Sequence, residues 1–90
     1  MPPLVVDATR LDRFMRRNRV KPIAIARFSG YSRQHLRRLR AGEMDPGRKA
    51  MIRITTGCSV ALGRRVHIWE VFDIGEDDFI REYIRIPERL

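Results

Sequence analysis

Four side chains that can read DNA bases lie within six consecutive positions of the chain. They are Arg33, Gln34, Arg37 and Arg38. Arginine can form two hydrogen bonds with guanine, and glutamine with adenine, in the major groove of DNA. At roughly 100° per residue, a helix places Gln34, Arg37 and Arg38 on one side with Arg33 at its flank, opposite Leu36 and Leu39. The spacing therefore predicts a helix that is anchored by two leucines and presents a base-reading face.

A basic helix taken alone is more often only a solvated surface, so the residues around it decide between the two interpretations. Ser32 is a good N-cap, because its hydroxyl can accept a hydrogen bond from a first-turn amide. Gly42 can adopt the left-handed conformation that ends a helix. These two residues predict a helix from about Arg33 to Ala41.

A second helix precedes this one and is joined to it by a short turn. It starts at Val20-Lys21-Pro22, since proline suits the first helical position, and it ends at Ser29-Gly30. The residues expected to face inward are Ile23, Ala26 and Phe28. Tyr31 would fill the gap between the two helices. Two helices joined by a turn of three or four residues that contains glycine form a helix-turn-helix.

Three further helices are expected around this pair. The first runs from about Ala8 to Asn18, with Asp7 or Thr9 as N-cap and Asp12 in capping-box position. Its inward residues are Leu11, Phe14 and Met15. The other two lie after the basic helix.

The fourth helix is expected to open at Pro46, with Asp45 as its cap, and to end at Gly63. Its inward residues are Met51, Ile54, Cys58 and Ala61 or Leu62. Thr55, Thr56 and Gly57 weaken its middle, so we expect a kink or break near Gly57. A short fifth helix over 66–72 closes the core with Ile68, Val71 and Phe72.

The final stretch, residues 75–90, fits two secondary structures. Phe79, Tyr83 and Ile86 fit a helical face after Asp77-Asp78, whereas residues 82–86 alternate as a strand does. Helix as far as Pro87 is slightly favoured. We therefore divide the chain into a helix-turn-helix domain, 1–74, and an extension, 75–90, for dimerisation or partner binding.

The charge of the 90-residue chain is unevenly placed. Its formal net charge is +8, yet residues 1–65 hold sixteen basic and four acidic side chains, and residues 66–90 hold three and seven. A surface that binds a polyanion is therefore expected in the first two-thirds. Nearly all the basic residues are arginine and not lysine. Arginine suits fork-like contacts to phosphates and bases, although a GC-rich genome would give the same preference for arginine.

Other classes of function find little support in the composition. The single cysteine, Cys58, has no partner for a disulfide and no histidine at metal-ligand spacing. We expect no metal, no cofactor and no enzyme activity, because no nucleophile has a base at plausible spacing. No apolar run approaches the roughly 20 residues of a membrane span, and residues 1–7 do not form a signal peptide. The cytoplasm is the default location.

From about Leu11 to Phe72, the sequence resembles the lambda-repressor-like, or Cro/C1-type (XRE family), helix-turn-helix domain of bacterial and phage regulators. The resemblance rests on Ala26-Arg27-Phe28-Ser29-Gly30-Tyr31-Ser32, on Leu36, Leu39 and Ala41-Gly42, on Asp45-Pro46, and on residues 66–72. It implies an all-α bundle of about five helices whose third helix enters the major groove. Arg33, Gln34, Arg37 and Arg38 match the base-reading positions of the family.

The resemblance also implies contacts with the DNA backbone. Ser32 matches a cap residue near a phosphate, and Lys21, Arg48 and Lys49 match the start of the second helix and the loop before the fourth.

The chain departs from the usual sequence of the family in three places. Pro22 replaces the usual phosphate-binding glutamine, and residues 55–65 are a few residues longer than usual. Arg40 and Met15 replace the usual glutamate and arginine of an ion pair, which would free Arg40 for a phosphate.

The leading hypothesis is a sequence-specific DNA-binding transcriptional regulator, expected to be a repressor that binds a palindromic operator as a homodimer. The alternative is an antitoxin-type interaction module that binds a partner protein through the acidic segment after Arg65. RNA binding is a weaker third choice, because the chain lacks the interleaved aromatic residues of common RNA-binding modules.

Overall fold

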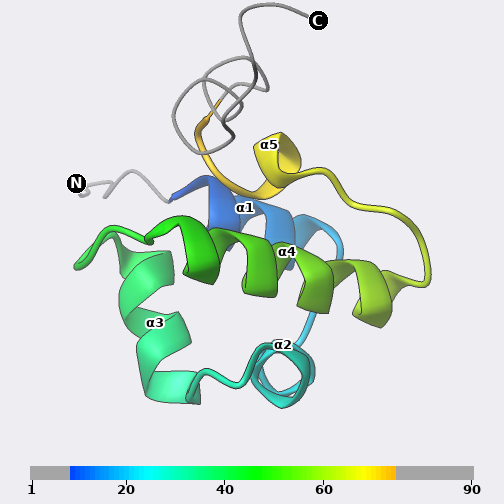
Figure 1. The fold of residues 1–90 in the computed structure, drawn as a ribbon, viewed down its shortest axis with the longest axis horizontal. Coiled ribbons are helices and arrows are strands. Elements are labelled where there is room, and N and C mark those ends of the chain that lie inside the picture. The colour runs from blue at the N-terminus through cyan, green and yellow to red at the C-terminus, as the bar shows by residue number, and fades with distance from the viewer. Residues whose placement is uncertain (1–8, 75–90) are drawn as a thin grey trace, which may run out of the picture.

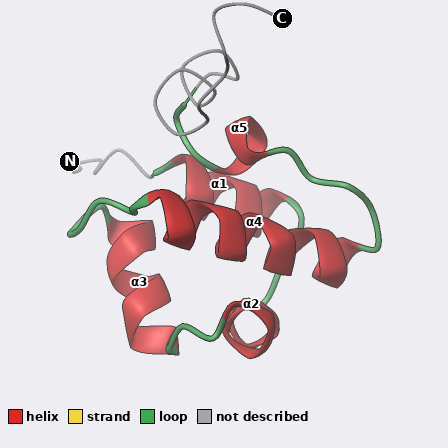
Figure 2. Cartoon of the chain, in the orientation of Figure 1, coloured by secondary structure: helices red, strands yellow, loops and turns green. Residues whose placement is uncertain are grey.

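A computed structural model describes residues 9–74, and within that range the chain is all helical (Figures 1 and 2). The five helices are α1 (Arg10–Arg17), α2 (Pro22–Ser29), α3 (Arg33–Ala41), α4 (Arg48–Leu62) and α5 (Ile68–Val71). The expected all-α bundle is thus confirmed. The expected extension, 75–90, lies outside the described residues.

The longest helix, α4, forms the centre of the bundle. In Figure 1 it runs across the molecule over α1, with α2 seen end-on on one side and α5 on the other. α3 lies at the edge of the bundle, next to the N-terminal end of α4. This arrangement leaves one side of α3 open to solvent.

Apolar side chains from all five helices and the loops between them meet in one core. Its members are Leu11, Phe14, Met15, Val20, Ile25, Leu36, Leu39, Met51, Ile54, Cys58, Val66, Val71 and Phe72. Each large apolar side chain that is fully buried here stabilises the fold by about 1.5–3 kcal/mol. The inward residues expected for α1 and the middle of α4 are confirmed.

The helix ends that were predicted from capping residues are largely confirmed. Thr9 Oγ1 accepts a hydrogen bond of 3.1 Å from the Asp12 amide, and Ser32 Oγ accepts one of 3.0 Å from the His35 amide. Gly42 has φ of 76°, so the left-handed end of α3 is present. A residue with a Cβ would be strained in that conformation.

The inward face of α2 differs from the expectation. Ile23 and Phe28 are each about half exposed, whereas Ile25 is completely buried and Ser29 is 3% exposed. Apolar residues occur on several sides of this short helix, so helical periodicity alone did not identify the buried one. Ala26, which was also expected to face inward, does pack against the core.

α4 also differs from the expectation, at its start and in its middle. It begins at Arg48 with Gly47 as N-cap, two residues after the predicted opening at Pro46. It continues through Gly57 without a break. A Cβ built on Gly57 would lie 3.5 Å from Cα and Cγ2 of Ile25. Gly57 therefore marks the place where α2 packs against α4, not a kink.

We expect Gly57→Ala to raise the free energy of unfolding by about 0.5–1 kcal/mol, because alanine is the better helix former by about that amount. The added Cβ would meet Ile25 at an ordinary van der Waals distance. Gly57→Leu should lower stability, because its longer side chain would push α2 away. Urea unfolding followed by circular dichroism measures both. A destabilised alanine variant would mean that α2 cannot accept even a methyl group.

Cys58 supplies a second test of the core. Its side chain is completely buried, and burial raises the pKa of the thiol from 9.0 to about 12. A group whose pKa is raised on folding stabilises the fold below its unfolded pKa and loses that contribution as pH rises. We expect the stability of the wild type to fall from pH 9 towards pH 12 more steeply than that of Cys58→Ala. Parallel pH profiles would contradict this.

Candidate nucleic-acid interface

The solvent-facing side of α3 carries the four predicted base-reading residues. Arg33, Gln34, Arg37 and Arg38 are all exposed. Leu36 is completely buried and Leu39 is 3% exposed on the opposite side. The narrow apolar stripe therefore fixes the rotation of the helix about its axis. That rotation brings all four polar side chains onto the side open to solvent, as the spacing predicted.

These four side chains differ in what they contact. Arg37 Nε donates to Gln34 Oε1 at 3.5 Å, and Arg37 Nη1 lies 3.3 Å from Glu43 Oε2. The Arg37 and Glu43 side chains are both more than half exposed, so this ion pair is weak and exchangeable. Arg33 and Arg38 make no hydrogen bond or ion pair with any residue in the described range. Glu43 is a contact that the sequence analysis did not anticipate.

The turn before α3 is held by local contacts. Ser29 Oγ, which is buried, accepts a hydrogen bond of 3.2 Å from the Tyr31 amide. Tyr31 packs against the core, as expected, and its ring centroid lies 4.7 Å from that of His35 in the first turn of α3. Residues 30–32 therefore connect α2 to α3 through a turn that is anchored at both ends.

A cluster of polar contacts holds the other end of α3 on α1. Arg40 Nε donates a hydrogen bond of 2.9 Å to Asp12 Oδ1, and Arg40 Nη2 lies 2.8 Å from the same oxygen. Asp12 Oδ2 lies 2.8 Å from Arg16 Nε. The Thr9 hydroxyl donates a hydrogen bond of 2.8 Å to the Arg40 carbonyl oxygen. We call these four residues the α1–α3 clamp.

The clamp corrects two expectations. The glutamate and arginine of the usual ion pair are both absent, as the sequence indicated, but Arg40 has a different carboxylate partner, Asp12, on α1, so the expectation that Arg40 is free for a phosphate was wrong. Asp12 was assigned to a capping box, but its two oxygens bind Arg40 and Arg16. The spacing of Asp12 and Arg16, four residues apart on a helix, was the sequence signal that could have shown an ion pair.

The remaining predicted phosphate-binding residues lie at helix starts. Lys21 is the N-cap of α2, while Arg48 and Lys49 are the first two residues of α4, and all three are exposed. No side chain caps either helix. A helix N-terminus attracts anions through its unpaired amides, and a neighbouring cation strengthens that attraction. Ser32 caps α3 and is exposed.

Residues 9–74 contain no group of three or more histidine, cysteine or acidic residues that could hold a metal ion. None of the helices there is both long and apolar enough to cross a membrane. No protein-family model matches the chain, and neither the curated proteins nor the solved structures gave a match.

The clamp predicts a specific pattern of stability losses. Asp12 is 8% exposed and its hydrogen bonds are to charged groups, so Asp12→Asn should cost about 1–3 kcal/mol. The Arg16 side chain is 74% exposed, so Arg16→Ala should cost at most about 1 kcal/mol. Urea unfolding measures both variants.

A double-mutant cycle isolates the contact between the helices. We expect Asp12→Ala and Arg40→Ala to be coupled by about 1 kcal/mol or more, because each removes the partner of the other. Additive effects, or equal losses for Asp12→Asn and Arg16→Ala, would show that the clamp does not hold α3.

Proposed function

We propose that this chain is a sequence-specific DNA-binding transcriptional regulator of the lambda-repressor-like type, in which α3 enters the major groove. The observation that carries the proposal is the orientation of α3. Its two leucines are buried and its four potential base-reading side chains are exposed together. The turn before α3 and the α1–α3 clamp hold the helix at both ends, which favours a defined docking geometry.

Affinity in this proposal comes mainly from the DNA backbone. Lys21, Arg48 and Lys49 would bind phosphates at the starts of α2 and α4, and the Ser32 hydroxyl would donate to another. Such contacts release counterions from DNA, so binding weakens steeply as salt rises. They position the protein on the duplex but carry no sequence information.

Discrimination between sequences would come from α3. Each good bidentate contact makes binding to the correct base more favourable than binding to a wrong base by about 1–3 kcal/mol. Arg33 and Arg38 have no partner in the described range to give up, whereas Arg37 would exchange its exposed contact with Glu43 for DNA. Arg40 belongs to the α1–α3 clamp and is left out of the proposed contact set.

The proposal extends to a homodimer that represses from a palindromic operator. Two copies related by a two-fold axis would place their α3 helices about 34 Å apart, one turn of DNA. The alternative antitoxin-type function depends on residues 75–90, which lie outside the described range. DNA binding is therefore the function that the described residues support.

Fluorescence anisotropy with a duplex selected from a random pool tests the proposal. Wild type should bind the selected duplex at least about a thousandfold more tightly than a random one. Its affinity should fall steeply between low and high salt. Equal affinity for both duplexes would overturn sequence specificity, and an affinity that does not depend on salt would overturn the phosphate contacts.

Three variants separate the two roles. Arg38→Ala should relax the preference at one base-pair position, while Lys49→Ala should weaken all duplexes alike and reduce the salt slope by about 1. Arg65→Gln is the control, because Arg65 is exposed and follows α4, whose C-terminal end lies away from α3 (Figure 1). It should change binding by less than about twofold. Identical behaviour of the first two variants would refute the division into base readers and phosphate binders.

A further inference from the structure

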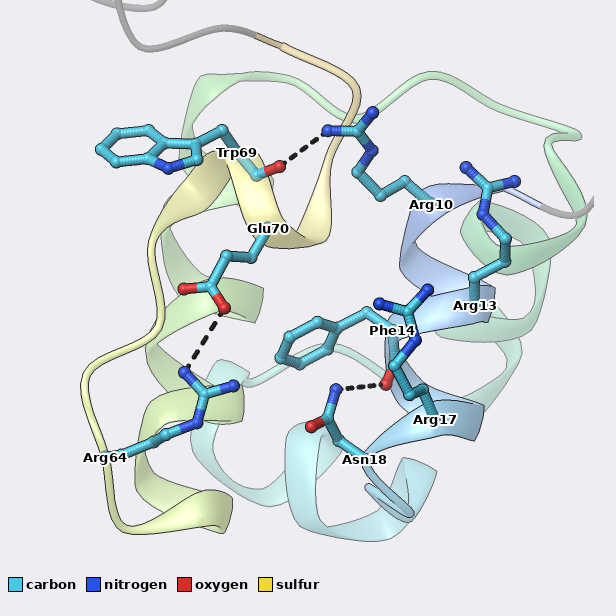
Figure 3. A pocket seen from close by; sticks show the side chains of 8 residues that line it. All are labelled: Arg10, Arg13, Phe14, Arg17, Asn18, Arg64, Trp69 and Glu70. Atoms are coloured by element: carbon cyan, nitrogen blue, oxygen red, sulfur yellow. Dashed lines mark hydrogen bonds and ion pairs between the residues drawn. The ribbon is translucent and has the colours of Figure 1, made fainter.

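A pocket of about 530 Å³ lies between α1 and α5, lined by none of the four residues of the α1–α3 clamp (Figure 3). Pockets that hold small ligands usually measure about 300–1,000 Å³. The residues that line this one come from α1 and its C-terminal end, from the loop after α4, and from α5. They are Arg10, Arg13, Phe14, Arg17, Asn18, Arg64, Trp69 and Glu70.

The lining holds four guanidinium groups against one carboxylate. In Figure 3 Arg10, Arg13 and Arg17 follow one another along α1, and Arg64 lies across from Arg17. Guanidinium is the side-chain group best suited to paired hydrogen bonds with a carboxylate or a phosphate. Arg10 is paired with Asp73 and Arg64 with Glu70, whereas Arg17 makes no ion pair with residues 9–74, so the lining still favours an anionic ligand.

The carboxylate in the pocket is fixed by its own contacts. Glu70 Oε2 accepts a hydrogen bond of 2.8 Å from the His67 amide, which lowers the pKa of Glu70, and the nearby charge of Arg64 lowers it further. Its other oxygen lies 3.4 Å from Arg64 Nη1. That contact is long, and the hydrogen bond of 3.1 Å from the same Nη1 to the Arg65 carbonyl oxygen is exposed, so Arg64 can exchange both for a ligand at little cost.

The arginines differ in how firmly they are held. Arg10 donates to the Trp69 carbonyl oxygen at 2.9 Å and lies 3.5 Å from Asp73, so it ties α1 to α5 and shapes the wall of the pocket. Arg17 is exposed and makes no hydrogen bond or ion pair with residues 9–74. Arg17 and Arg64 are therefore two guanidinium groups that can close on a ligand.

An aromatic ring lies between these two arginines. Phe14 projects from α1 into the region between Arg17 and Glu70 (Figure 3), and it is 5% exposed. Its edge provides an apolar surface at the base of a strongly basic pocket. A ligand that fits both features has an oxyanion at one end and an apolar ring or chain at the other.

We propose that this pocket binds a small organic anion, with its carboxylate or phosphate between Arg17 and Arg64 and its apolar body against Phe14. The site is separate from α3 and does not depend on the proposed DNA binding. Asn18, whose Nδ2 donates 2.9 Å to the Phe14 carbonyl oxygen, keeps the end of α1 in place beside the ligand.

Four probes test the two parts of the ligand by titration into the full chain. Phenyl phosphate and benzoate carry a ring and an oxyanion, inorganic phosphate carries only the oxyanion, and phenol carries only the ring. The readout is the indole N–H signal of Trp69 in a nuclear magnetic resonance spectrum. That signal is unique, because the chain has one tryptophan, and Trp69 lines the pocket.

We expect saturable shifts with phenyl phosphate or benzoate, at an affinity at least about fivefold above that of inorganic phosphate and of phenol. The better of the two ring-bearing probes identifies the oxyanion. If none of the four probes saturates the signal below about 10 mM, the proposal is overturned.

Variants locate the binding. Arg17→Gln with Arg64→Gln should weaken the preferred probe by about tenfold or more, because both paired contacts are lost. Arg27→Gln with Arg53→Gln is the control, since it removes two exposed arginines that do not line the pocket. Circular dichroism confirms that each variant is folded. An equal loss of affinity in the control would mean that the probe binds by general ionic attraction to the protein, and would overturn the proposed site.

The acidic stretch at positions 76–78 provides the last arm of the test. In a variant with Glu76→Gln, Asp77→Asn and Asp78→Asn, the preferred probe should bind with an affinity within about threefold of the wild type. If the probes bind only to this variant, the acidic side chains at 76–78 compete with them for the pocket in the wild type, and the proposal of a free ligand is wrong.

Discussion

The structure depends on a carboxylate that is almost fully removed from water. Asp12 is 8% exposed and accepts one hydrogen bond from Arg40 and one from Arg16, with a second nitrogen of Arg40 at 2.8 Å. A buried carboxylate is costly unless such donors surround it, so Asp12 requires Arg40 to stay in place. Arg40 in turn belongs to α3. The position of the basic helix is therefore determined by an electrostatic requirement of α1, in addition to the burial of its own leucines.

The sequence predicted the features that depend on neighbouring residues. Ser32, Gly42 and the two leucines of α3 act within one or two turns of the same helix, so their roles follow from local physics. The exposure of the four predicted base-reading residues followed directly from them. The predicted phosphate-binding positions came from a resemblance, and the described residues place them at helix starts without showing what they bind.

The features that could not be predicted depend on contacts between distant parts of the chain. Whether Ile25 or Phe28 is buried depends on how α2 crosses α4, and a helix with apolar residues on several sides does not reveal that. The partner of Asp12 is 28 residues away. The role of Gly57 depends on the close approach of Ile25, and the sequence does not reveal it, because a glycine in a helix can mark either a weak point or a close approach.

The direction of the clamp has a consequence for protein engineering. The expected family pattern has a basic residue on the first helix and an acidic one near the end of the third, whereas here α1 supplies the acid and α3 the base. A third helix transplanted from a protein with the usual pattern would place two carboxylates against each other in a nearly dry site. An α3 sequence of the usual pattern can therefore replace the present one only when residue 12 is changed together with residue 40.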